Sequence, residues 1–123
     1  MAVHGKMETL QLRAGADLSA LQYKAIKIDG TIAVAGSDAI GILQNKPGAA
    51  GEDATVCYFG HAKASAGAAI TKGNRVTLTA SGTFLPVTSG DGMAGRALES
   101  VSSGGVFEGI FNFVNAATLI DNV

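Results

Sequence analysis

Residues 54–64, ATVCYFGHAKA, decide the fold class, because they carry the clearest β-strand pattern in the chain. Side chains of a strand point alternately to opposite faces of a sheet. One face here would hold Val56, Tyr58, Gly60 and Ala62, and the other would hold Thr55, Cys57, Phe59, His61 and Lys63. The preceding residues, NKPGAAGED (45–53), predict a loop, since their Pro and Gly favour turns and interrupt a helix.

Similar short runs lie on both sides of this strand and are separated by turn-forming residues. Asp29-Gly30 predicts a type I′ hairpin turn, because both central positions of that turn need φ > 0. Pro86 cannot donate a hydrogen bond to a neighbour, so its run predicts an edge strand or the end of one. The last run is apolar on both faces and predicts a central or an interface strand. The predicted strands are 23–28, 31–35, 40–44, 75–79, 83–87, 95–99 and 106–115.

This spacing predicts an all-β domain, a small β-barrel-like or β-sandwich-like (β-tulip-like) fold of seven to nine strands. No stretch shows helical periodicity over eleven residues. Residues 1–20 show no sustained alternation and predict an extended N-terminal arm, followed by a single β domain over 21–123. Such an arm is either a frayed terminus or a segment that orders on a partner surface.

The composition limits the classes of partner. Charged residues make up 15% of the 123 residues and the net charge is −1, so no basic surface for nucleic acid or an anionic membrane is expected. No apolar run approaches the ~18 residues that span a bilayer. One cysteine excludes an internal disulfide framework. So low a charge predicts that part of the surface is covered by other protein subunits.

The residues that carry chemistry in enzymes are sparse and poorly placed. Residues 90–95, GDGMAG, match the dinucleotide fingerprint G-x-G-x-x-G, but no helix follows to receive a pyrophosphate. His61 and Cys57 would lie about 13 Å apart on a strand, too far to share a metal. Glu108 lies within an apolar strand and needs a partner, for which Arg75 and Arg96 are candidates. We therefore expect no catalysis, no metal and no cofactor.

Two stretches, residues 41–56 and 73–99, carry turn-and-strand patterns that resemble the capsid decoration (cement) proteins of tailed bacteriophages. Their shared forms are G-ILQN-P-AG-ATV and G-V-L-A-G-F-A-G-RALE, and the similarity extends over residues 20–115. The resemblance implies a β-barrel-like subunit without catalysis or cofactor. It also implies a homotrimer on the outer capsid surface, at junctions of the major capsid protein, after synthesis in the host cytoplasm.

If this resemblance holds, the arm and the last strand are the segments in which to expect contacts with the capsid or between copies. The predicted interface residues are Leu10, Leu12, Arg13, Leu18, Leu21, Tyr23, Phe107, Phe111 and Phe113. A host-surface or carbohydrate-binding β-module is a second hypothesis, although Trp is absent and Tyr23 and Tyr58 are the only tyrosines. A tail or head-completion protein of the virion and a small trimeric β-enzyme also fit an all-β chain of this size.

Overall fold

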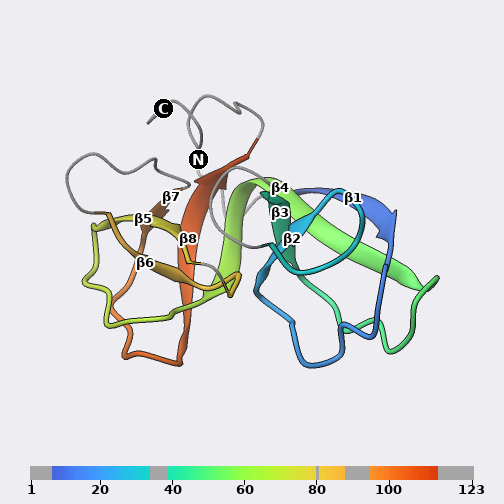
Figure 1. Cartoon of the computed structure of the whole chain (residues 1–123). Coiled ribbons are helices and arrows are strands. Elements are labelled where there is room, and N and C mark those ends of the chain that lie inside the picture. The colour runs from blue at the N-terminus through green and yellow to red at the C-terminus, as the bar shows by residue number, and fades with distance from the viewer. Residues whose placement is uncertain (1–6, 34–38, 80, 88–94, 114–123) are drawn as a thin grey trace, which may run out of the picture.

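The computed structural model describes residues 7–33, 39–79, 81–87 and 95–113, and over these residues the chain is all-β. Figure 1 shows the long strand β4 between a lobe that holds β5 to β8 and a lobe that holds β1 to β3. The eight strands within the described residues are β1 (Met7–Arg13), β2 (Ala25–Lys27), β3 (Ala39–Leu43), β4 (Asp53–Ser65), β5 (Arg75–Leu78), β6 (Phe84–Pro86), β7 (Gly95–Ala97) and β8 (Val106–Asn112). The predicted fold class is confirmed.

The strands form one curled sheet in the order β2-β3-β4-β8-β7-β5-β6, and β1 pairs with β4. A parallel bridge between Ala66 and Phe84 brings the end of β4 alongside β6. The Gly67 N–H donates to the Phe84 carbonyl at 2.7 Å next to this bridge. The path from β4 through β8, β7 and β5 to β6 therefore curls back on itself, as in a small barrel. Pro86 lies in the last strand of the order and β8 lies between β4 and β7, as predicted.

β4 belongs to both lobes and contains a β-bulge at Tyr58. The pairing of β1 with β4 skips one residue, because Glu8 is opposite Phe59 and Thr9 is opposite Cys57. The extra residue bends the strand and re-aims its side chains. The sequence prediction placed Cys57 and His61 on one face; this is wrong, because Cys57 is fully buried and the exposed face begins at Phe59.

Two clusters of buried side chains fill the interior, one on each face of the β2-β3-β4 wall. The small cluster holds Ala14, Leu18, Ile26, Leu43, Ala54 and Val56. The large cluster lies between β4 and β6 and holds Ile42, Cys57 and four rings: Phe84, Phe107, Phe111 and Phe113. Neighbouring residues of β3 and β4 thus point into different clusters, which explains why Ile42 and Leu43 are both buried.

The turn at Asp29-Gly30 differs from the predicted type. Gly30 has φ +82°, but Asp29 is not among the residues with positive φ. The Gly30 N–H donates to the Lys27 carbonyl at 3.0 Å, and the Lys27 N–H donates to the Thr31 carbonyl at 2.8 Å. These bonds define a type I turn closed by a glycine bulge, the common three-residue hairpin loop. The predicted strand 31–35 is reduced, over its described residues, to a bridge between Ile32 and Ile26.

The N-terminal segment also differs from the sequence prediction. Residues 7–13 form β1, which pairs with β4 along its whole length, although no sustained alternation was found in the sequence of residues 1–20. The segment after it is anchored as well, because the Ala14 N–H donates to the Glu52 carbonyl at 2.8 Å. Residues 1–6 lie outside the described residues, and the boundary at residue 20 stays a prediction. Of the G-x-G-x-x-G motif, the described Gly95 begins a strand and not a helix.

Candidate interaction surface

The outward side of the sheet formed by β4, β8, β7 and β5 is the most distinctive surface of the described chain. Inward residues of these strands, such as Val76, Ala97 and Phe107, are buried, and the residues between them point outward. Cross-strand partners lie side by side on one face. We call this surface the outer face and define it by Phe59, His61, Lys63, Arg75, Arg96, Leu98, Val106, Glu108 and Ile110.

Four large apolar side chains are exposed on the outer face. Phe59, Leu98, Val106 and Ile110 keep between 41% and 47% of their surface accessible. His61 is directly opposite Ile110, and Phe59 precedes His61 by two residues on the same strand. Apolar side chains gathered in this way on one face mark sites of protein contact more often than single exposed residues do.

An imidazole–carboxylate pair lies among these apolar side chains. His61 Nε2 is 2.9 Å from Glu108 Oε1, and the two side chains are 30% and 45% exposed. The Glu108 backbone N–H donates to the Glu99 carboxylate at 2.8 Å. The sequence suggested an arginine as the partner of Glu108, but its contact here is with His61. The pair gives the apolar surface a polar group of fixed direction.

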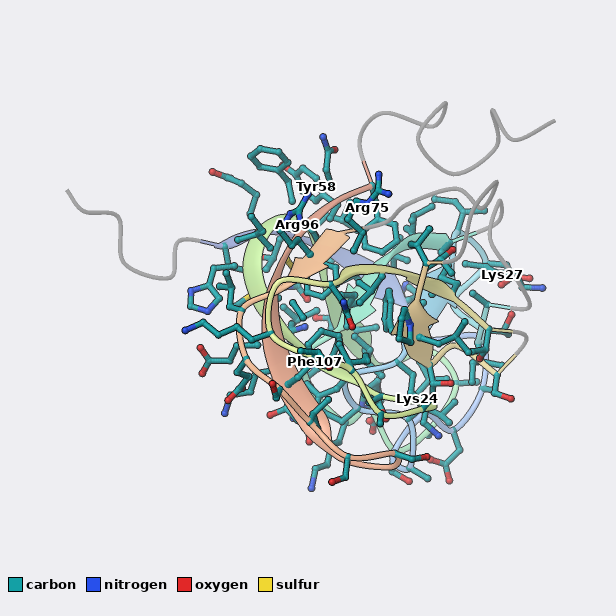
Figure 2. All side chains as sticks on the ribbon, turned by 90° about the vertical axis from the view of Figure 1, so that its left-hand side faces the viewer. Lys24, Lys27, Tyr58, Arg75, Arg96 and Phe107 are labelled. Atoms are coloured by element: carbon teal, nitrogen blue, oxygen red, sulfur yellow. The ribbon has the colours of Figure 1, made fainter. Side chains whose placement is uncertain are left out.

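Two arginines are directly opposite each other at the edge of the outer face. Arg75 on β5 pairs with Arg96 on β7, and both are exposed. Figure 2 shows the two side chains at the same end of the molecule. Arg96 Nη1 donates to the Gly73 carbonyl at 2.8 Å, which fixes its direction. Like charges directly opposite each other on a sheet are destabilising, so this arrangement favours an anionic partner.

A shallow hollow of about 300 Å³ opens beside the His61–Glu108 pair. Tyr23 in its wall has φ +72°, and its backbone joins two strands: its N–H donates to Leu43 at 2.7 Å and its carbonyl accepts from Ser65 at 2.8 Å. These bonds hold a conformation that a bulky residue rarely adopts. The hollow is lined by Met7, Tyr23, Gln44, His61, Ala62, Lys63 and Glu108.

The structure separates the interface residues predicted from sequence into two groups. Four have almost no accessible surface, because they fill the clusters of their own chain: Leu18, Phe107, Phe111 and Phe113. The others keep accessible surface: Leu10, Leu12, Leu21 and Tyr23 are half-buried, and Arg13 is exposed and donates to the Gly51 carbonyl at 3.4 Å. Sequence reasoning missed Phe59, Leu98 and Ile110. The available signal was the last strand, whose phenylalanines point inward and leave its aliphatic residues outside.

Burial raises the pKa of the Cys57 thiol, whose Sγ donates to the Phe59 carbonyl at 3.5 Å. Within the described residues, no group of three or more His, Cys, Asp or Glu side chains is arranged to hold a metal ion. No helix in that part of the chain has the length and apolar character needed to cross a membrane.

The described chain is thus an all-β subunit with an exposed apolar sheet face. A family model described as "Phage cement protein" matches residues 4–113, so this chain belongs to the phage cement protein family and is a structural protein of the phage virion. A solved structure of similar fold is the head fiber gp8.5 N base in bacteriophage phi29. The two chains are 18% identical with a TM-score of 0.65 over 88% of this chain and 96% of the other. The search of curated proteins found no match.

Proposed function

We propose that this protein decorates the outer surface of a bacteriophage capsid. It binds as a trimer at junctions between subunits of the major capsid protein and stabilises the shell. The observation that carries this proposal is the outer face, where four large apolar side chains remain between 41% and 47% exposed. Family membership supports attachment to the phage shell. The name of the similar structure, a fibre base on a phage head, supports a position on the outside of the head.

The energetics of such attachment are adequate. Removing apolar surface from water contributes roughly 25 cal/mol per Å², so a few hundred Å² gives several kcal/mol before the cost of association. A trimer presents three such contacts at a high effective concentration, which multiplies a modest single affinity. Many copies bound across subunit junctions would then oppose the outward pressure of packaged DNA.

Some residues predicted from sequence are kept as secondary contacts in this proposal. The arm predicted for residues 1–20 would touch a neighbouring subunit along the exposed side of β1, which is itself paired with β4. The contacting side chains are those with accessible surface, namely Leu10, Leu12, Arg13, Leu21 and Tyr23.

Mixing the purified protein with undecorated, expanded capsids tests this function. We expect saturable binding in multiples of three copies and a higher melting temperature of the capsid. The double variant Leu98→Ser/Val106→Ser should bind at least tenfold more weakly, because it removes two of the four exposed apolar side chains of the outer face. The control is Lys46→Ser, which changes an exposed side chain in the loop before β4, away from the outer face and the arm. Binding without a rise in melting temperature would remove the stabilising role, and absence of binding would remove decoration altogether.

A further inference from the structure

The tip of the first hairpin carries an apolar side chain that is largely exposed. Ile28 is 70% exposed, more than the other exposed large apolar side chains of the described residues. Turn tips favour Gly, Pro, Asn, Asp and Ser, so a protruding Ile is an unusual choice there. Asp29 follows it and is also exposed. The tip therefore combines an apolar side chain with a carboxylate.

This tip is held rigidly before any partner arrives. Asp29 Oδ1 accepts hydrogen bonds from the Thr31 N–H at 3.0 Å and from the Thr31 hydroxyl at 2.6 Å. The Gly30 carbonyl accepts from the Gly15 N–H at 2.9 Å, which ties the turn to the segment after β1. A contact group that is already ordered loses little conformational entropy when it binds.

The outer face offers the complementary chemistry on another part of the molecule. Arg75 and Arg96 lie directly opposite each other, and within the described residues neither is paired with a carboxylate; exposed Ile110 is directly opposite Arg96 on the next strand. An incoming carboxylate would offset the repulsion between the two guanidinium groups, and an apolar side chain beside it would cover Ile110. In Figure 2 the arginines lie at the top of the molecule and Lys27, beside the tip, lies at its right.

We infer that the Ile28–Asp29 tip of one copy seats on the Arg75–Arg96–Ile110 part of the outer face of a second copy. This inference rests on the trimer in the proposed function and names the surfaces that form it. A tip and a face on different parts of one chain make a heterologous contact, which closes into a ring when the rotation between copies allows. Three copies each use one tip and one Arg75–Arg96–Ile110 site, so every tip is paired, and the rest of the outer face, with Phe59, Leu98 and Val106, stays free for the capsid. Lys27, the cation beside Asp29, stays at the rim of this contact.

Charge reversal tests this contact, with the oligomeric state measured by light scattering and sedimentation equilibrium. We expect Asp29→Arg alone, and Arg75→Glu/Arg96→Glu alone, to weaken trimerisation by at least tenfold. The triple variant Asp29→Arg/Arg75→Glu/Arg96→Glu reverses both sides of the contact and should restore the trimer. Ile28→Ser should weaken it without any change of charge.

The chain provides matched controls. Asp17 is exposed and accepts the same two hydrogen bonds, from the Ser19 N–H at 2.9 Å and from its hydroxyl at 2.7 Å, so Asp17→Arg controls for loss of this local motif. Lys46→Glu/Lys72→Glu changes the net charge as much as the arginine pair does. Circular dichroism and thermal unfolding identify any variant that fails to fold.

The outcomes separate this inference from the proposed function. A monomeric wild type would overturn the trimer and this contact together. A trimeric wild type whose reversed variants stay trimeric, or whose triple variant folds but does not recover, would overturn this contact alone. Variants that remain trimeric but lose capsid binding would assign the same surfaces to the shell and also overturn it.

Discussion

Asp29 shows how one side chain fixes the shape of a turn. Its carboxylate accepts two hydrogen bonds from Thr31, first from the hydroxyl and then from the backbone, and these lower its pKa below the ordinary value of 3.8. A group whose pKa is lower in the folded state adds stability above its unfolded pKa and loses it as the pH falls through the folded pKa. The hairpin tip is therefore held at neutral pH and loosens only below about pH 4.

Thr31→Val tests this account, because it removes the hydroxyl donor and keeps the shape of the side chain. We expect the pKa of Asp29 to rise toward 3.8, as measured by NMR titration of the carboxyl carbons. Asp17, whose pKa is lowered by Ser19 in the same way, should keep its value. An unchanged pKa of Asp29 in this variant would show that the Thr31 hydroxyl does not stabilise the carboxylate.

Substitutions at Gly30 and Gly51 distinguish the cost of a positive φ from the cost of steric crowding. Both have positive φ, +82° and +93°. A Cβ at Gly30 would lie 2.6 Å from the Gly15 nitrogen and press on the Arg13 carbonyl, whereas a Cβ at Gly51 meets nothing within 4 Å. Gly51→Ala should lower the free energy of unfolding by about 1 kcal/mol, and Gly30→Ala by about 3 kcal/mol or more. Urea denaturation measures both, and equal losses would contradict the crowding at Gly30.

At the scale of elements, the alternation of apolar and polar residues in the sequence predicted most strands, but it did not predict the β-bulge. The predicted strand at 54–64 is β4 to within a residue at each end. The bulge at Tyr58 left no mark in that pattern, and it decides which residues of β4 face outward. β1 was not predicted, although Leu10 and Leu12 alternate with Thr9, Gln11 and Arg13. The segment is short of apolar residues, and in the structure even its inward side chains are only partly buried.

The outer face was hard to predict for a related reason. A strand that is apolar on both faces does not reveal which face is inside. The rings of Phe107 and Phe111 lie 6.1 Å apart and meet Phe84 from β6, so partners distant in sequence select the inward face. Ile110, which alternates with these rings along β8, is therefore left outside.

Phe84 is the element-scale test of how the sheet closes. It is fully buried, and its ring centroid lies 5.3 Å from that of Phe111 and 6.3 Å from that of Phe107. Phe84→Ala should lower the free energy of unfolding by about 3–5 kcal/mol, because it empties the contact between the edge strand and β8. The half-buried neighbour Leu85 is the control, and Leu85→Ala should cost under about 1 kcal/mol. Similar losses in urea denaturation would show that β6 packs loosely on the curled sheet.

At the scale of the whole molecule, the two clusters share one wall. Ile42 and Cys57 belong to the large cluster, while their neighbours Leu43 and Val56 belong to the small one. β4 continues from this wall into the pairing with β8. Loss of the small cluster would expose one face of strands on which the large cluster is built, so the two lobes should unfold as a single cooperative unit.

Leu18→Ala tests this cooperativity, because Leu18 is fully buried in the small cluster and far along the chain from β8. We expect it to lower the free energy of unfolding by about 2–5 kcal/mol. Hydrogen exchange followed by NMR should show the same loss for the slowest amides of β8 as for those of β4, since both exchange through global opening. If β8 kept its full protection while β1 and β3 lost theirs, the lobes would be independent. The outer face would then stay folded in a subunit whose hairpin tip had unfolded. The β2-β3-β4 wall would not couple the unfolding of the two lobes.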